Sequence, residues 1–261
     1  MGAPEQIFGV TGLTCLADGS ITATMPTGPW LSSRPGDDRG TLGALGLLAD
    51  TVFGHANHVV APAGWNWSVT TELSLQLLSP LPVDGQQLVA LARAVGVDQR
   101  SALTLGEIRT ASGALVAVGS ERGRFVPDGP EAAVREHGPD DDQPHQPAPP
   151  SAASLADLFG EVQVAEERTT MSVSPRVTNP RGNLHGGMSL GLADLAAATA
   201  VPELNTTSIH MTYARALAAG QDAIEVTATP THLGRSLAVV AVRAHGRGTG
   251  KLIFAATVVR E

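Results

Sequence analysis

The sequence predicts an α+β fold in which two similar domains follow one another, each an antiparallel sheet wrapped around one central helix. Three observations support this prediction. A polar, proline-rich stretch divides the chain near its middle. The two flanking blocks share short motifs in the same order. The second block contains one small, apolar helical segment followed by several strand-like segments.

The dividing stretch runs from residue 128 to residue 154. It is rich in Pro, Asp and Ala and almost lacks large apolar residues, and it includes His137 and His145. Such a composition buries too little apolar surface to offset the entropy lost on ordering, so we expect an exposed linker. The predicted domains are therefore 1–127 and 155–261, with the linker between them.

Four motifs recur in the two blocks in the same order. "LLADTVFGHA" and "GLADLAAATA" pair Asp50 with Asp194, and "TTELSLQL" and "TTSIHMTY" pair Thr70 with Thr206. An Arg-Ser pair follows in each block, after 30 residues in the first (70 to 100) and 29 in the second (206 to 235). "SGALVAVGS" and "TGKLIFAAT" complete the series. Four matches at similar spacing favour a duplicated domain.

The secondary structure of the second block follows from its periodicity. Residues 186–201 are small and apolar on all sides, begin with two glycines and precede Pro202, which predicts a buried helix. The following segments are short, β-branched and separated by glycine-containing turns, which predicts an antiparallel meander. These segments are "TSIHMTYARAL", "AIEVTATPTHLG", "SLAVVAVRA" and "KLIFAATVVR".

Composition excludes several classes of protein. The 261 residues are 43% hydrophobic and carry a formal net charge of −8, which does not suit a binder of nucleic acid phosphates. No apolar run approaches the length of a membrane span, and no signal peptide is evident, so we expect a soluble, cytoplasmic protein. The single cysteine, Cys15, fits a reducing compartment, and we expect it in the core. We expect no bound metal and no cofactor.

Three short motifs suggest other chemistries but lack the required context. Gly187-Met-Ser-Leu-Gly191 matches the nucleophile elbow of α/β-hydrolases, but a polar segment rather than a strand precedes it. "HGRGTGKL" resembles a phosphate-binding loop, yet the first required glycine is His245. "HANH", at 55–58, has helical spacing for two metal ligands but no third ligand.

The stretch "NPRGNLHGGMSLGLADLAAATA" resembles the hotdog-fold acyl-CoA thioesterases of the phenylacetate-pathway (PaaI-like) type. That family carries an Asn, a Gly, a His-Gly-Gly and an Asp on the central helix, with a Ser or Thr on the next strand. The matching residues here are Asn179, Gly182, His185-Gly186-Gly187, Asp194 and Thr206. The resemblance implies two tandem hotdog domains, hydrolysis of an acyl-CoA thioester, coenzyme A as part of the substrate, and a homodimer of such chains.

The residue types also suit thioester hydrolysis by themselves. Backbone N–H groups around Gly186, at a helix N-terminus, can stabilise a developing oxyanion. An Asp carboxylate can attack the carbonyl carbon or activate a water, and the sequence leaves both routes open. Asn179 would bind the carbonyl or the water, a threonine would orient the water, and we expect His185 to close the turn rather than to act as the base.

The position of Asp194 then requires a second helix. Asp194 lies eight residues after Gly186 (186 to 194), or ~12 Å along the axis at 1.5 Å per residue, so it cannot reach a carbonyl held at its own N-terminus. The base must come from the other half, where Asp50 and Thr70 remain. Opposite His185-Gly186-Gly187, that half has only Thr41-Leu42-Gly43. We therefore expect one composite site per chain, with Asp50 as its carboxylate; the alternative for Asp50 is a local capping role.

The candidate catalytic residues are thus Asp50, Thr70, Asn179, His185, Gly186, Asp194 and Thr206. Because coenzyme A carries phosphates, cations near turns are added, and the candidate substrate-binding residues are Arg100, Gly187, Arg235 and Ser236. Three alternative functions remain: a non-catalytic acyl-CoA-binding module, a hotdog dehydratase acting on acyl thioesters, and an esterase.

Overall fold

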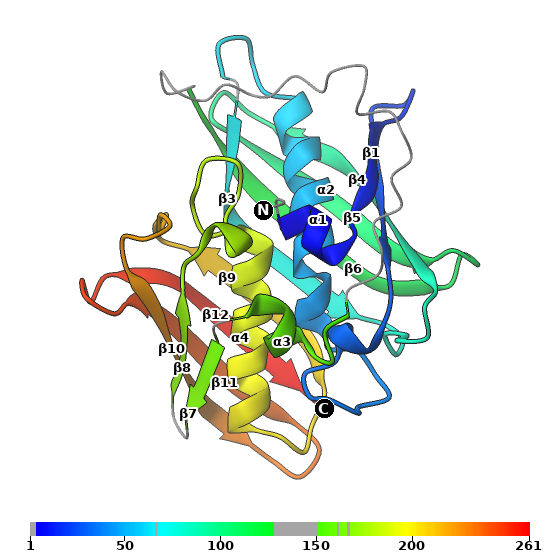
Figure 1. Cartoon of the computed structure of the whole chain (residues 1–261). Helices are drawn as coiled ribbons and strands as arrows, with labels where there is room; N and C mark the ends of the chain where they lie inside the picture. The colour runs from blue at the N-terminus through cyan, green and yellow to red at the C-terminus, as the bar shows by residue number, and fades with distance from the viewer. Residues whose placement is uncertain (1–3, 66, 128–150, 161, 166–167) are drawn as a thin grey trace.

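The computed structural model describes residues 4–65, 67–127, 151–160, 162–165 and 168–261. Within them, twelve strands form one antiparallel sheet in the order β1-β2-β4-β5-β6-β3-β9-β12-β11-β10-β8-β7, with two long helices, α2 and α4, packed against it (Figure 1). The prediction of an antiparallel sheet wrapped around central helices is confirmed at this level.

The N-terminal half supplies the first six strands. Its helical elements are α1 (Pro4–Phe8), η1 (Pro29–Leu31), η2 (Leu42–Leu45) and α2 (Gly46–Val59). Its strands are β1 (Thr11–Cys15), β2 (Ile21–Pro26), β3 (Trp67–Leu77), β4 (Gln87–Val97), β5 (Ser101–Thr110) and β6 (Leu115–Val126).

The C-terminal half repeats this succession. Its helical elements are α3 (Leu155–Phe159), η3 (Pro175–Val177) and α4 (Gly186–Ala200). Its strands are β7 (Val162–Ala165), β8 (Arg168–Ser172), β9 (Thr206–Tyr213), β10 (Ala223–Leu233), β11 (Ala238–Gly246) and β12 (Leu252–Arg260). Counting outward from the middle of the sheet, β3, β6, β5 and β4 match β9, β12, β11 and β10.

The two halves meet along two contacts. In the sheet, β3 pairs with β9, so that Leu73 lies opposite Met211. Above the sheet, the first turns of α2 and α4 cross closely, because a Cβ on Gly187 would overlap with the carbonyl group of Gly46. Glycine at this crossing lets the two helix N-termini approach at backbone distance. Each helix can therefore present a side chain to the other's N-terminus.

A shared irregularity fixes the correspondence between the halves. The pairing of β3 with β6 shifts register just after Thr70, and that of β9 with β12 shifts just after Thr206. In each case the threonine lies opposite a residue of the last strand, which is Gly123 in the N-terminal half and Arg260 in the C-terminal half. A β-bulge re-aims the neighbouring side chains, so the same position in each half receives the same geometry.

Two expectations about exposure need correction. Cys15 is exposed at the end of β1 rather than placed in the core, because β1 is an edge strand with most of its residues facing solvent. The end of the predicted linker is ordered: Ser154 is buried and caps α3, and Leu155 N–H donates to the Ser32 carbonyl. Residues 128–150, with His137 and His145, lie outside the described residues, and the two-domain division stays a prediction.

None of the described helices is long and apolar enough to cross a membrane.

Candidate active site

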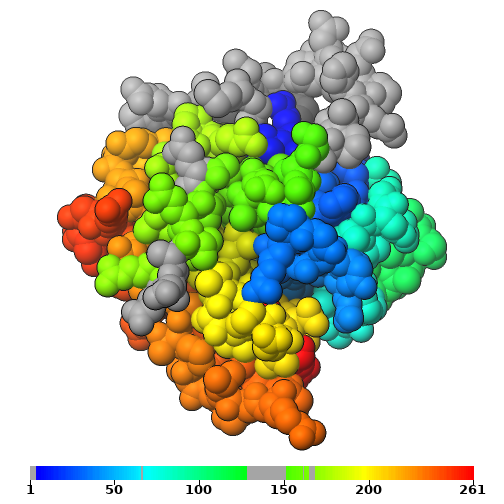
Figure 2. Space-filling model, turned by 60° about the horizontal axis from the view of Figure 1, so that its bottom comes forward, coloured from blue at the N-terminus to red at the C-terminus, as the bar shows by residue number. Residues whose placement is uncertain are grey.

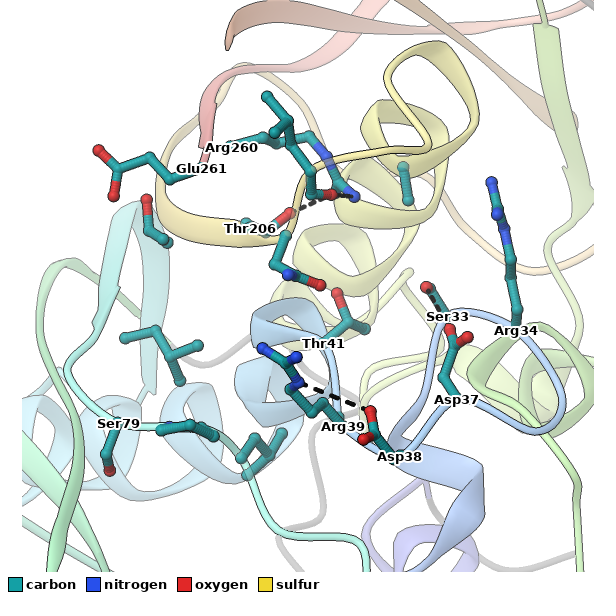
Figure 3. Close-up of a pocket in the computed structure, with 18 of the residues that line it drawn as sticks. Ser33, Arg34, Asp37, Asp38, Arg39, Thr41, Ser79, Thr206, Arg260 and Glu261 are labelled. Atoms are coloured by element: carbon teal, nitrogen blue, oxygen red, sulfur yellow. Dashed lines mark hydrogen bonds and ion pairs between the residues drawn. The ribbon is translucent and has the colours of Figure 1, made fainter. Parts of the chain in front are cut away.

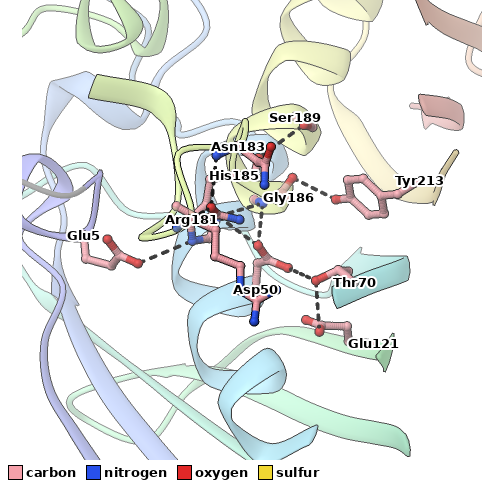
Figure 4. A network of polar contacts seen from close by, with 12 residues as sticks. Glu5, Asp50, Thr70, Glu121, Arg181, Asn183, His185, Gly186, Ser189 and Tyr213 are labelled. Atoms are coloured by element: carbon pink, nitrogen blue, oxygen red, sulfur yellow. Dashed lines mark hydrogen bonds and ion pairs between the residues drawn. The ribbon is translucent and has the colours of Figure 1, made fainter. Parts of the chain in front are cut away.

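Asp50 lies in the second turn of α2 and faces the N-terminus of α4 (Figure 4). Asp50 is 8% exposed, so its carboxylate has little contact with solvent. Oδ2 accepts a hydrogen bond from Gly187 N–H at 2.9 Å and lies 2.8 Å from His185 Nδ1, while Oδ1 accepts from Thr70 Oγ1 at 2.8 Å. Three predicted residues, two from the start of α4 and one from β3, therefore converge on one carboxylate of α2.

His185 lies between two carboxylates. Its Nδ1 faces Asp50, and its Nε2 lies 3.4 Å from Oε1 of Glu5, on α1. Burial lowers the pKa of His185, but the charges and hydrogen bonds of Asp50 and Glu5 outweigh it and raise the pKa to about 10. His185 is thus an imidazolium at neutral pH, and a protonated Nδ1 donates to Asp50. Gly187 N–H also lies 3.2 Å from this Nδ1. Because a protonated Nδ1 cannot accept a hydrogen bond, Gly187 N–H donates to Asp50.

Asp50 stays ionised in this setting. Burial raises the pKa of its carboxyl, but the charge and hydrogen bond of His185, together with the Thr70 and Gly187 donors, lower it below its usual value. A buried aspartate that is an anion at neutral pH is chemically competent to accept a proton or to attack a carbonyl carbon.

Gly186 is the first residue of α4 and is partly exposed. A Cβ at this position would lie 2.8 Å from Asp50 Oδ2, so any side chain would crowd the carboxylate. The Gly186 carbonyl accepts a hydrogen bond from the Tyr213 hydroxyl at 2.8 Å, which fixes the first turn of the helix. Because the first N–H groups of a helix have no partner within it, this turn can donate to an anion placed beside Asp50.

A second, buried carboxyl stands behind Thr70. Glu121, on β6, is 1% exposed, and its Oε1 lies 3.2 Å from Thr70 Oγ1 and 3.3 Å from Asn57 Nδ2. Burial and the nearby charge of Asp50 raise the pKa of Glu121 well above its usual value. Because Thr70 has one proton and donates it to Asp50, a protonated Glu121 can donate to Thr70 in turn. This residue was not predicted.

The second aspartate, Asp194, lies in a closed cluster. Its Oδ2 accepts hydrogen bonds from Thr41 Oγ1 at 2.5 Å and Gly43 N–H at 2.6 Å. Its Oδ1 accepts from Thr206 Oγ1 at 2.5 Å and forms an ion pair with Arg260 Nη1 at 3.4 Å. Asp194 is fully buried, so its oxygens are occupied by protein donors and shielded from water.

The two clusters are built on the same plan with different residues. Gly43 N–H binds Asp194 as Gly187 N–H binds Asp50, and Thr41 stands where His185 stands. The shared bulge matches Glu121 to Val258 and Gly123 to Arg260. The surroundings of the two aspartates therefore differ in charge. Asp50 has the buried acid Glu121 nearby, whereas Asp194 has the buried guanidinium of Arg260. The counterpart of Gly186 is Leu42, which is fully buried. The Asp194 cluster thus lacks both the open glycine and an accessible carboxylate.

Asn179 organises its own loop. Its Oδ1 accepts from the N–H groups of Arg181 at 3.0 Å and Asn183 at 3.2 Å, closing the turn that leads to His185. The geometry gives this side chain a role in shaping the loop, and its predicted contact with substrate stays a prediction.

Arg100 lies in the exposed turn between β4 and β5. Just after this turn, Ala102 pairs with Gly123, which pairs in turn with Thr70 on the neighbouring strand. Arg100 is therefore at the same end of the sheet as the Asp50 cluster.

Arg235 and Ser236 lie in the exposed turn between β10 and β11. Ala238 pairs with Arg260, and Arg260 pairs with Thr206. The register places these two residues at the end of the sheet that holds the Asp194 cluster, away from Asp50. Their predicted contact with substrate at the Asp50 site stays a prediction.

A family model and a known protein are similar to parts of this chain. A family model described as "Acyl-CoA thioesterase N-terminal domain" matches residues 174–260, which contain α4 and β9 to β12. A protein of Deinococcus radiodurans described as "Putative esterase" is 31% identical over 121 residues, covering 42% of this chain and 82% of that protein.

Solved structures share the fold over nearly the whole chain. A hot dog fold protein from Alicyclobacillus acidocaldarius has a TM-score of 0.63 and 11% identity, covering 100% of this chain and 98% of that one. An acyl-ACP thioesterase from Bacteroides thetaiotaomicron has a TM-score of 0.61 and 14% identity, covering 93% and 98%. Fold and site together define a hotdog-type thioester hydrolase. The chain belongs to the hotdog-fold thioesterase family.

Removal of the Glu5 charge tests the pairing with His185. In Glu5→Gln, His185 loses one of its two carboxylates, so we expect its pKa to fall from about 10 toward 6.5. A raised pKa stabilises the fold fully below the unfolded value near 6.5, and that contribution disappears as pH rises through the folded value. The alkaline loss of thermal stability should therefore be smaller and complete at lower pH in this variant than in wild type, and kcat should fall at lower pH.

The pH dependence of Tm and of kcat between pH 6 and 11 measures this shift. Glu203→Gln, at an exposed loop position, is the matched control and should leave both profiles unchanged. Identical profiles for Glu5→Gln and wild type would show that Glu5 does not hold the charge of His185.

Proposed function

We propose that this protein hydrolyses acyl-CoA thioesters at one composite site, in which Asp50 of the N-terminal half acts on a carbonyl held at the N-terminus of α4. The observation that carries the proposal is the hydrogen bond from Gly187 N–H to Asp50 Oδ2, at 2.9 Å, which joins a carboxylate of one half to a helix N-terminus of the other. The match of residues 174–260 to an acyl-CoA thioesterase model supports the substrate class.

The proposed reaction uses the groups on both sides of this contact. The thioester carbonyl carbon gains an oxygen, either from a water whose proton passes to Asp50 or from the Asp50 carboxylate itself. The carbonyl oxygen becomes an oxyanion and accepts from Gly186 N–H, where the helix dipole favours negative charge. The C–S bond then breaks and the thiolate leaves; in the water route the thiolate takes the proton from Asp50, which restores the carboxylate. If Asp50 attacks directly, water cleaves the resulting anhydride and restores the carboxylate.

The surrounding residues have supporting roles in this scheme. His185 holds Asp50 in place by charge and hydrogen bond, and Thr70 orients the other carboxylate oxygen. Arg100, exposed at the same end of the sheet, is the cation that we assign to the phosphates of coenzyme A. Asp194 and Thr206 belong to the closed cluster and have no step in the reaction.

We also propose that the chain is a tandem of two hotdog domains of the PaaI-like type. The matched order of strands, the shared bulge and the mirrored contacts of Gly43 and Gly187 support a duplication. The PaaI-like motif of the C-terminal half, His185-Gly186-Gly187, forms the helix N-terminus that binds Asp50. Pairing of two such chains and a cytoplasmic location stay predictions.

Gly186→Ala tests the proposed site together with the substrate class. A Cβ would meet both Asp50 oxygens within 2.9 Å and occupy the place of the substrate carbonyl. We expect kcat for release of free thiol from acyl-CoAs to fall roughly 10²-fold or more, as for the loss of one oxyanion donor, because Ala keeps its N–H but its Cβ blocks the carbonyl from reaching it. Gly182→Ala is not a suitable control because Gly182 has a positive φ, so the control is Thr199→Ala, at an exposed position in the last turn of α4.

The assay is the release of free thiol from short, long and aromatic acyl-CoAs. Wild type should hydrolyse at least one of these classes. If wild type is inert on every acyl-CoA, or if Gly186→Ala retains full activity, the proposed function at this site is contradicted.

A further inference from the structure

A cavity of about 390 Å³ lies beside the Asp194 cluster rather than beside Asp50 (Figure 3). Thr41, Thr206 and Arg260, the residues that hold Asp194, are part of its lining. Figure 2 shows, on one face of the molecule, the blue segment that contains residues 33–40 lying against the yellow segment around residue 200. Both halves of the chain therefore contribute to this cavity, as both contribute to the Asp50 site.

The correspondence between the halves relates the cavity to the proposed active site. Thr41, Asp194 and Thr206 are the counterparts of His185, Asp50 and Thr70, so the cavity opens on the position that the substrate occupies in the other half. A duplication that keeps the groove but changes the residues at its base keeps the capacity to bind the same class of ligand.

The lining combines an apolar side with charges of both signs, which include the carboxylates of Asp37, Asp38 and Glu261. One side is apolar and is formed by the leucines, prolines and alanine of two segments: Leu77, Leu78, Pro80, Leu81, Ala198, Pro202 and Leu204. At the rim, Asp37 accepts a hydrogen bond from Ser33, and Asp38 pairs with Arg39 at 3.5 Å. Arg34, by contrast, forms no ion pair with any of the described residues and is exposed, so its charge is available to an anion.

The base of the cavity cannot hydrolyse a thioester. Asp194 is fully buried and its oxygens are taken by Thr41, Gly43, Thr206 and Arg260. The adjacent helix start carries Leu42, fully buried, in place of the open glycine. A ligand that enters the cavity meets neither a free carboxylate nor an open oxyanion site.

We propose that this cavity is a second, non-hydrolytic site for an acyl thioester of the same class as the substrate. The proposal rests on the proposed function for its ligand class. Each chain would then bind two acyl thioesters and hydrolyse one of them.

Calorimetric titration with a non-hydrolysable S-alkyl coenzyme A tests this. We expect two molecules bound per wild-type chain and one per chain in Leu78→Trp, whose indole would cover the cavity mouth; Leu78 is 55% exposed, so the fold should tolerate the change. Leu105→Trp, at a 50% exposed position on β5, is the matched control and should bind two. Arg34→Glu should weaken the same site at least tenfold.

Two results would overturn the proposal: one molecule bound per wild-type chain, or two per chain in Leu78→Trp with unchanged affinities. Thiol release from the substrate, measured in parallel, separates this failure from failure of the proposed function. If the substrate is hydrolysed but only one analogue binds, only the second site is contradicted. If two analogues bind but no substrate is hydrolysed, the cavity is supported as a binding site and the proposed function is contradicted.

Discussion

Asp50→Asn is expected to lower kcat for thioester hydrolysis roughly 10²- to 10⁴-fold, the range typical for loss of a positioned general base. An amide cannot take the proton of water at neutral pH and is a poor nucleophile, although it retains nearly the same shape. Thr70, His185 and Gly187 can still surround the side chain, so the fold should survive. Steady-state kinetics and a denaturation curve measured on the same preparation check both statements.

Asp194→Asn provides the matched comparison within the same chain. Asp194 has an equivalent helix position and an equivalent set of donors, but it is fully buried and paired with Arg260. We expect this variant to be less stable and to keep kcat within roughly threefold of wild type at temperatures where it remains folded. If Asp194→Asn loses activity and Asp50→Asn keeps it, the catalytic carboxylate belongs to the C-terminal half, and the assignment to Asp50 is contradicted.

Arg260→Ala is expected to give the largest loss of stability, about 3–5 kcal/mol of unfolding free energy, because it leaves a buried charge without its partner. Arg260 is 4% exposed and its guanidinium binds Asp194, Thr206 and the carbonyls of Val201 and Leu204. Urea denaturation followed by circular dichroism measures the change.

The double variant Asp194→Leu/Arg260→Met separates charge from packing. Replacement of both partners of a buried ion pair by apolar residues is often neutral, so the double variant should be clearly more stable than Arg260→Ala. If Arg260→Ala unfolds with the same free energy as wild type, the Asp194 cluster is not the ion-paired, closed structure described above.

Local sequence signals predicted the helices and the contact between them. The rise of 1.5 Å per residue excluded Asp194 as the base for its own helix N-terminus and directed attention to Asp50. The alignment of Gly43 with Gly187, from their equal distance to each Asp, matches two equivalent backbone hydrogen bonds in the structure. These inferences depended on spacing within one segment, which a sequence displays directly.

The residues that were missed depend on long-range register. Glu5 reaches His185 only because α1 packs against α2 and η3, and nothing near either residue signals this contact. Glu121 and Arg260 gave a weak signal, since each is a charged residue that the alternation of its strand places on the inward face. Their partners could not be named without the pairing of β3 with β6 and of β9 with β12.

The turn residues show the same limit. Arg100 and Arg235 occupy matching positions in the repeat, and sequence alone treats them alike. The strand register places one turn at the end of the sheet near Asp50 and the other at the end near Asp194. In the proposed scheme, the composite site therefore takes its cation, Arg100, from the half that supplies the aspartate.

The central claim is that the two halves of one chain build a single hydrolytic site, and mixing two inactive variants tests it most directly. Asp50→Asn keeps the helix N-terminus at Gly186, and Gly186→Ala keeps the carboxylate. The two chains are co-expressed, purified together through different tags, and assayed for thiol release from an acyl-CoA. If each site is formed within one chain, the mixture shows only the sum of the two residual activities. Recovery of a substantial fraction of wild-type activity would show that the aspartate and the helix N-terminus come from different chains, and would contradict this account.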